Sequence, residues 1–232
     1  AGPAMKKHTL RALAALSKFL GIHDEFTELR KRYGIKWSHG SAARLVARRL
    51  SGEVSNGIFE WIVKALRVLD EDHRTLTRYV LFTGVRLDEA CKTWKLIHEL
   101  GHERVNEYYN AAFNALEHYR YPKLFFRETK NLFVSFVTPE LVEDILRGRR
   151  DKITWWSVSS ALRKRGLPSR YADLRELWAT WMTRYLSEPE INFLQGRVSQ
   201  STFMRHYFNP KLIADLRDRT LNAASKLLEK IT

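Results

Sequence analysis

Apolar residues recur at intervals of three and four over most of the chain, and this spacing restricts the fold more than any other feature. The period is that of an α-helix with one buried face, as in the stretch from Leu10 to Leu20. It is interrupted after Pro122, where Leu124–Phe126 and Leu132–Val137 are typical of two short strands. The sequence therefore predicts a mainly α-helical fold with one small β-hairpin, whose bend carries Lys130.

A polar, glycine-containing stretch at residues 51–57 is the best candidate for a domain boundary. Residues 6–52 before it predict a small basic module of three helices, and residues 58–232 predict the main domain. Residues 1–5 read Ala-Gly-Pro-Ala-Met, which is typical of a cloning remnant. A helical pattern already running at Lys6 predicts that the chain was cut from a longer one.

The chain is strongly basic, with 40 Lys and Arg against 26 Asp and Glu and a formal net charge of +14. The basic residues are clustered, for example at 147–150 and 163–165. Because neutralising phosphates releases counterions, this excess favours a nucleic-acid partner over a generic soluble surface.

The single cysteine, Cys91, excludes an intramolecular disulfide and a Cys-rich zinc site, and its apolar helical neighbourhood predicts a core position. No apolar run reaches the length of a transmembrane helix. We therefore expect no membrane association and a location in the cytoplasm, at the nucleoid.

Three short motifs and one tyrosine occur in a fixed order in the second part of the chain. The first motif reads Thr-Gly-Val-Arg and ends with Arg86, at a predicted turn between two helices. The second reads Asp-Leu-Arg followed by Ala-Thr, and it places Arg175 near the start of an apolar helix. The third is Gly-Arg, with Arg197 22 residues after Arg175, and Tyr207 follows ten residues later. Each residue alone is more often structural than catalytic, so only their joint occurrence is informative.

In order and spacing these motifs resemble the tyrosine recombinase, or phage-type integrase, family, with archaeal and mobile-element integrases as the nearest likeness. The likeness covers about residues 58–210, and the helical module before them resembles the end of the family's DNA-binding core-binding domain. It implies that Tyr207 attacks DNA to form a covalent 3′-phosphotyrosyl bond. It also implies that Lys130 protonates the leaving 5′-hydroxyl as general acid, with Lys123 and Lys95 as alternatives. DNA strands would be cleaved and rejoined without a metal ion, ATP or another cofactor.

The chemistry of a phosphodiester explains why these residue types occur together. Attack on phosphorus builds negative charge on the non-bridging oxygens, and planar guanidinium groups such as those of Arg86, Arg175 and Arg197 can hold it. A phenol with an ordinary pKa of about 10 needs such a cationic neighbourhood to become a nucleophile. No cluster of Asp, Glu and His has convincing metal-ligand spacing, which agrees with a reaction that uses no metal.

The sequence departs from the family pattern in two places. The histidine that usually lies three residues before the second arginine is replaced by Ala172, which can neither accept nor donate a proton. Tyr171 is a candidate for an accessory phosphate contact there. At the position of Arg197 the family commonly has histidine, and an arginine cannot accept the proton of Tyr207. That proton is then lost to water or to His206.

DNA binding and assembly follow from the same resemblance. A clamp on duplex DNA and a homotetramer are implied, with the final predicted helix, Asn209–Ile231, packed in cis or exchanged in trans. Two alternatives stay open: a monomeric type IB topoisomerase-like enzyme, and a non-catalytic basic DNA-binding protein. The second is favoured by Ala172, which replaces the usual histidine. The candidate phosphate contacts are Lys36, Arg44 and Arg48 in the first module, and Arg163, Arg165 and Arg170 before the second motif.

Overall fold

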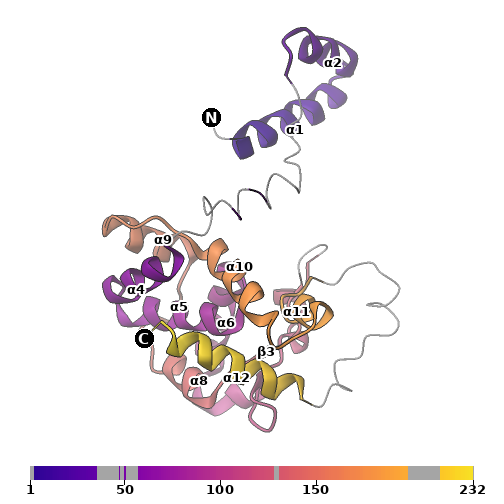
Figure 1. Cartoon of the computed structure of the whole chain (residues 1–232). Helices are drawn as coiled ribbons and strands as arrows, with labels where there is room; N and C mark the ends of the chain where they lie inside the picture. The colour runs from indigo at the N-terminus through magenta and orange to yellow at the C-terminus, as the bar shows by residue number, and fades with distance from the viewer. Residues whose placement is uncertain are drawn as a thin grey trace. The chain divides into compact units, whose positions relative to one another are not determined.

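The computed structural model describes residues 3–35, 47, 50, 57–127, 131–197 and 215–231. The chain divides into two compact units, residues 1–56 and residues 57–232 (Figure 1). In the first unit, α1 (Pro3–Phe19) and α2 (His23–Arg32) form a helical pair. The turn at Gly21 joins them, and Ser17 Oγ lies 2.9 Å from His23 Nδ1 across it.

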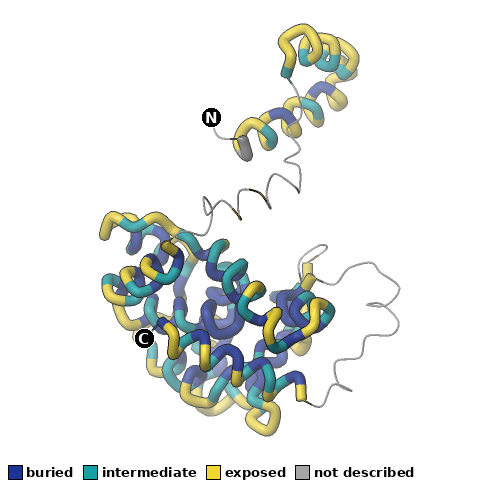
Figure 2. Tube along the Cα trace, viewed as in Figure 1, coloured by how far each residue is buried: buried dark blue, intermediate teal, exposed yellow. Residues whose placement is uncertain are grey.

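The second unit is built around α5 (Glu71–Thr83), which packs against α4 (Ile58–Val68) and α6 (Leu87–Arg104). It also contacts α8 (Pro139–Leu146) and α10 (Tyr171–Met182). A central helix must be apolar on nearly all sides, and five consecutive α5 positions, 79–83, are buried (Figure 2). This core holds both the helix that precedes Arg86 and the helix that carries Arg175.

The last described helix, α12 (Leu216–Glu229), packs against α5 and α10 of its own chain. Its apolar face is buried, and Trp181 Nε1 donates to Ala223 O across the contact at 2.8 Å. Arg219 of α12 also donates to Glu190 on α11 (Glu188–Leu194). The described part of the final helix is therefore docked in cis.

Two helices begin at threonines whose side chains cap them. Thr138 accepts from Leu141 N at 3.4 Å before Pro139 opens α8. Thr154 and Ser157 form a reciprocal capping box at the start of α9 (Trp155–Lys164). Cys91 is buried, as its apolar surroundings predict.

A three-stranded antiparallel sheet of order β1-β2-β3 lies beside the helices, and it confirms the mainly α class with a small β element. It consists of β1 (Tyr109–Asn110), β2 (Ala115–Leu116) and β3 (Ser135–Phe136). Tyr109 pairs with Leu116, and Leu116 pairs with Ser135.

The predicted hairpin partners were wrong. Leu124 and Phe125 belong to a one-turn helix, α7 (Pro122–Phe125), opened by its proline, and β3 pairs with β2 instead. The reason is packing: buried Phe125 lies against His118 with the two rings tilted and their centroids 4.5 Å apart. The chain does turn back here, since Leu132 N donates to Phe125 O at 3.2 Å.

The helical pattern of the sequence also continues over Glu103–Tyr119, but the structure has no such helix. α6 is kinked at Gly101 and ends at Arg104, and Asn114 has a positive φ of 48° in the turn between β1 and β2. Two short 3₁₀ turns flank these strands, η1 (Val105–Glu107) and η2 (His118–Arg120). The strands are too short for a two-residue period to show in the sequence.

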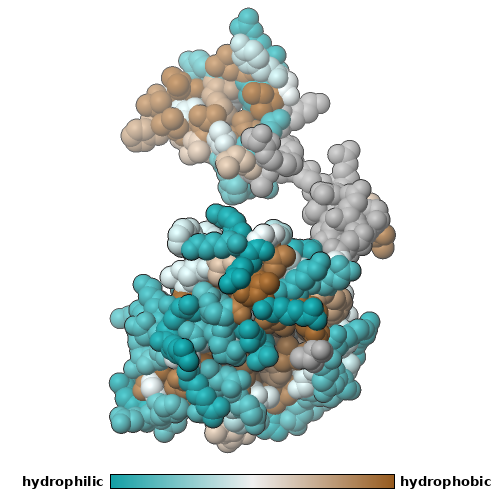
Figure 3. Space-filling view, turned by 90° about the vertical axis from the view of Figure 1, so that its left-hand side faces the viewer, coloured by the Kyte–Doolittle hydropathy of each residue, from teal (hydrophilic) through white to brown (hydrophobic). Residues whose placement is uncertain are grey.

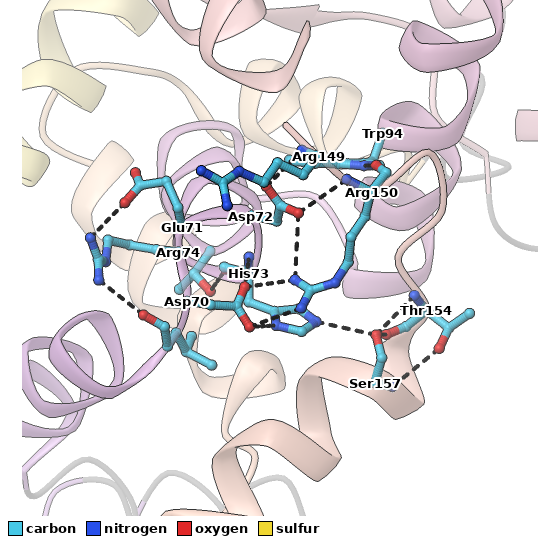
Figure 4. Close-up of polar contacts among 12 residues, drawn as sticks. Asp70, Glu71, Asp72, His73, Arg74, Trp94, Arg149, Arg150, Thr154 and Ser157 are labelled. Carbon is cyan, nitrogen blue, oxygen red and sulfur yellow. Dashed lines mark hydrogen bonds and ion pairs between the residues drawn. The ribbon is translucent and has the colours of Figure 1, made fainter. Parts of the chain in front are cut away.

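At the N-terminal end of α5 a polar network ties the basic segment 147–150 to the helix (Figure 4). Arg150 binds both oxygens of Asp70, at 2.7 and 3.3 Å. Asp72 accepts from the backbone N–H groups of Arg149 and Arg150, each at 3.1 Å. A cavity of about 550 Å³ lies here. The positive charge of Arg150 is thus paired with a carboxylate of the protein itself.

The surface of the second unit seen in Figure 3 is mainly hydrophilic, with apolar side chains in small patches. Within the described residues, no helix has both the length and the apolar character to cross a membrane.

Candidate active site

The first motif forms the sharp connection between α5 and α6. Gly84 ends α5 with a left-handed φ of 66°, and its N–H donates to Val80 O at 2.9 Å. A Cβ on this residue would lie 2.3 Å from the ring of Trp178, so glycine is required by both conformation and contact. Two residues later, Arg86 occupies the N-cap of α6.

Arg86 is held by Glu89, three residues further along. Glu89 accepts from Arg86 N at 2.9 Å and from Arg86 Nη1 at 2.5 Å, while its own side chain is 1% exposed. The Arg86 side chain remains partly accessible at 26%. The buried carboxylate therefore holds the guanidinium in place and leaves part of it accessible. The sequence interpretation missed Glu89, although the three-residue spacing of a capping box was a usable signal.

Arg175 lies on the buried face of α10, where an arginine requires specific partners. Its Nη1 donates to Gly84 O at 2.8 Å, and its Nη2 donates to Gln195 O at 2.5 Å. The second motif is thus bonded directly to the first, and to the residue just before the third.

The third motif begins at the C-terminal end of α11. Gly196 N donates to Phe193 O and Arg197 N donates to Asn192 O, which is the pattern of a Schellman motif with Gly196 at φ 63°. This end structure directs the chain out of the helix at Arg197, whose side chain is exposed.

The first two motifs and the residue just before the third meet at one atom, the carbonyl oxygen of Gly84. It accepts from Arg175 Nη1 and also from Gln195 Nε2, the latter at 3.4 Å. Burial, together with the positive charges of Arg86 and Arg197, lowers the pKa of Arg175 to about 9, while Glu89 acts in the opposite direction. At neutral pH the site therefore presents three arginines near one another with a single buried carboxylate. Such an excess of positive charge suits an anion with several oxygens, such as a phosphodiester.

Comparison with known families was then decisive. The family model described as archaeal phage integrase matches residues 58–221.

The chain belongs to the archaeal phage integrase family.

No curated protein and no solved structure gave a significant match. Membership indicates a role in DNA recombination and, with it, DNA binding. The matched region contains all three motifs of this integrase, and it also contains the positions of Lys130 and Tyr207. The resemblance noted from the motifs alone is thereby confirmed at the level of the family.

Within this integrase, Tyr171 does not present its hydroxyl to the arginines as an accessory ligand. The hydroxyl lies 2.6 Å from Thr77 Oγ1, and the side chain is 6% exposed and meets Trp61 edge-on. Burial also raises its pKa. This geometry assigns Tyr171 to the core. Ala172 beside it is exposed.

The remaining predicted residues divide into two groups. Arg163 and Arg165 are exposed at the end of α9, and Arg170 is half-buried with its Nε donating to Asp173 at 2.6 Å. These positions leave the first two available for phosphate contacts. Six further candidates lie outside the described residues: Lys36, Arg44, Arg48, Lys130, His206 and Tyr207.

Proposed function

We propose that this integrase cleaves and rejoins DNA strands through a covalent bond between Tyr207 and a 3′-phosphate. The observation that supports the proposal most strongly is the position of Arg175, which is bonded to the Gly84 carbonyl of the first motif and lies within reach of the positive charges of Arg86 and Arg197. In the proposal these three arginines form one anion-binding site, although Arg86 and Arg197 are more than 100 positions apart in the chain. The motif order places Tyr207 ten residues beyond the last of them.

In the proposed reaction the arginines bind the non-bridging oxygens of the scissile phosphate. The phenolic oxygen of Tyr207 attacks phosphorus, and the bond between phosphorus and the 5′-oxygen breaks. The leaving oxygen takes a proton from Lys130. Because the phosphotyrosyl ester keeps the free energy of the broken phosphodiester, a 5′-hydroxyl of another strand can reverse the step without ATP.

The proton of Tyr207 needs a route that does not use Arg197, because a guanidinium has no free acceptor at ordinary pH. In our proposal water takes it, or His206, the neighbour of the nucleophile in the chain. The cationic arginines favour the phenolate electrostatically. Their role in this step is to stabilise charge, while the proton leaves elsewhere.

For the rest of the DNA we propose contacts by basic side chains, and a homotetramer that holds two duplexes together. Such contacts supply affinity and little sequence preference. The candidates are Arg163, Arg165 and Arg170 in the second unit and Lys36, Arg44 and Arg48 in the first.

The proposal is tested with a nicked suicide duplex that traps the covalent product. The protein is incubated with labelled duplex in the presence of EDTA, and adducts are separated on a denaturing gel. We expect an adduct with the wild-type chain and none with Tyr207→Phe. The Tyr185→Phe variant serves as a matched control, because Tyr185 packs beside Trp181 in the folded unit.

Three results would change the interpretation. No adduct from a folded wild-type protein that binds the duplex would support a non-catalytic DNA-binding role. Relaxation of supercoiled DNA by a monomer, without recombinant products, would support the topoisomerase-like alternative. An adduct that persists in Tyr207→Phe would contradict the choice of nucleophile.

A further inference from the structure

Gln195 is the C-cap residue of α11, and it lies at the junction of the three motifs with no exposed surface. Its carbonyl accepts from Arg175 Nη2 at 2.5 Å. Its side-chain nitrogen donates to Gly84 O at 3.4 Å and to Arg175 O at 3.1 Å. The residue therefore contacts Arg175 through its backbone and through its side chain.

The oxygen of the same amide accepts no hydrogen bond from the part of the chain that the structure describes. Gln195 Oε1 is buried, and no hydrogen-bond donor among the described residues reaches it. A buried acceptor without a donor costs free energy that an apolar side chain of similar size would avoid. Stability of the fold is therefore a poor explanation for an amide at this position.

The two carbonyls that receive the amide N–H groups do not depend on it either. Gly84 O already accepts the shorter bond from Arg175 Nη1. The carbonyl of Arg175 lies inside α10, where the helical hydrogen-bond pattern supplies a donor. What the amide adds is a link between groups that are already paired.

That link closes a ring of hydrogen bonds around the guanidinium of Arg175. Nη1 reaches Gly84 O, Gly84 O is joined to the Gln195 side chain, and the Gln195 carbonyl returns to Nη2. An arginine has five N–H groups, and these bonds engage two of them. The ring thereby fixes the orientation of the guanidinium and of its remaining N–H groups.

We infer that Gln195 is a positioning residue, which holds the Arg175 guanidinium in the orientation that receives the scissile phosphate. This inference rests on the proposed function, in which Arg175 binds that phosphate. A donor held in place before the reaction stabilises developing charge without reorganising at the moment of attack. The effect belongs to the cleavage step more than to DNA affinity, because phosphate contacts along the duplex supply the affinity.

The test compares Gln195→Met with Asn192→Leu. Methionine fills a similar volume without the amide. Asn192 lies on the same helix, where its side-chain nitrogen donates to Glu188 at 3.4 Å and not to the groups around Arg175. For each protein we measure the cleavage rate at saturating enzyme on the suicide duplex, the Kd for the duplex by fluorescence anisotropy, and the thermal midpoint.

We expect the cleavage rate of Gln195→Met to fall at least tenfold, with a Kd within twofold of wild type and an equal or higher thermal midpoint. Asn192→Leu should match wild type in all three. A folded Gln195→Met that cleaves at the wild-type rate would overturn the inference. So would a loss of rate explained by a lower thermal midpoint, because the amide would then be structural.

A second measurement does not depend on cleavage. The guanidinium ¹⁵N–¹H signals of Arg175, assigned with Arg175→Lys, report how fast the group rotates. We expect separate, slowly exchanging Nη signals in wild type and averaged signals in Gln195→Met. Suppose that the wild type forms no adduct, but its Nη signals are separate and those of Gln195→Met are averaged. The proposed function then fails, while the positioning of the Arg175 guanidinium by Gln195 is supported. Averaged signals in both proteins would contradict the positioning itself.

Discussion

Gly196 lies directly against the backbone of Asn131: a Cβ built on Gly196 would come within 1.4 Å of the Asn131 carbonyl oxygen. Asn131 follows Lys130 in the chain, and Gly196 precedes Arg197. The contact continues at Phe133, whose ring stacks on Phe193 of α11 with centroids 5.8 Å apart. The third motif and the segment after the proposed general acid are therefore packed together, through the one residue type that permits it.

Replacing Gly196 should damage the site more than replacing another left-handed glycine. Gly196→Ala must displace backbone and also strain φ, so we expect the free energy of unfolding to fall by more than about 3 kcal/mol. Gly166 has a φ of 75° with open space around it, so Gly166→Ala should lose only about 1–2 kcal/mol. Urea unfolding measures both. Equal losses would show that the contact with Asn131 does not constrain the site.

Replacing Arg175 by lysine tests the guanidinium separately from its charge. Lysine cannot reach two carbonyls and an anion with fixed geometry, so cleavage of the suicide duplex should fall by about 100-fold or more. Arg163→Lys, on the exposed end of α9, should cleave at nearly the wild-type rate. A wild-type rate in a folded Arg175→Lys would remove Arg175 from the proposed phosphate site.

The docking of α12 should depend on Glu190. Its carboxylate accepts hydrogen bonds from Arg219 at 2.6 and 3.2 Å and another from Ser187 Oγ. Its side chain is 7% exposed. Glu190→Gln removes the buried anion of Arg219 and leaves only the exposed Asp215 to pair with it, so we expect a loss of about 1–3 kcal/mol in unfolding free energy. The exposed Glu188→Gln should change it by less than about 0.5 kcal/mol.

Hydrogen exchange of the α12 amides should locate this loss. Faster exchange in Glu190→Gln than in Glu188→Gln is the expected result. Unchanged exchange in α12 would mean that the ion pair does not hold the helix in cis.

His118 should make the protein less stable in mild acid. It is fully buried between Tyr108 and Ser135, at 2.5 and 2.8 Å, and burial lowers its pKa to about 3. In the unfolded chain this histidine has an ordinary pKa of about 6.5. In mild acid the unfolded chain therefore binds a proton there, and the folded chain does not. Stability is therefore complete above the unfolded pKa and falls as the pH drops toward 3, by about 2 kcal/mol between pH 7 and pH 5.

Urea unfolding at the two pH values measures this, and His118→Gln should remove that part of the difference. His102→Gln is the control, because His102 is exposed. The same pH dependence in wild type and in a folded His118→Gln would show that His118 does not carry it.

The sequence by itself determined the helical class, the ends of several helices and the family. These depend on local chemistry: Thr138 and Thr154 cap because a hydroxyl reaches an N–H three residues on, and Gly84 ends α5 because it tolerates a left-handed φ. The order and spacing of Arg86, Arg175 and Arg197 are likewise visible in the sequence alone. The hairpin prediction failed because the burial of Phe125 against His118 outweighed its preference for a strand.

Only the tertiary structure decided how the motifs meet. The bonds that join them link residues 91, 20 and 111 positions apart, and no local period or cap specifies such pairs. They form because the packing of α5, α10 and α11 brings one carbonyl oxygen, that of Gly84, within reach of two donors. The same packing placed Tyr171 in the core and brought Glu89 and Gln195 into the site, since burial and partner geometry are properties of the assembled core.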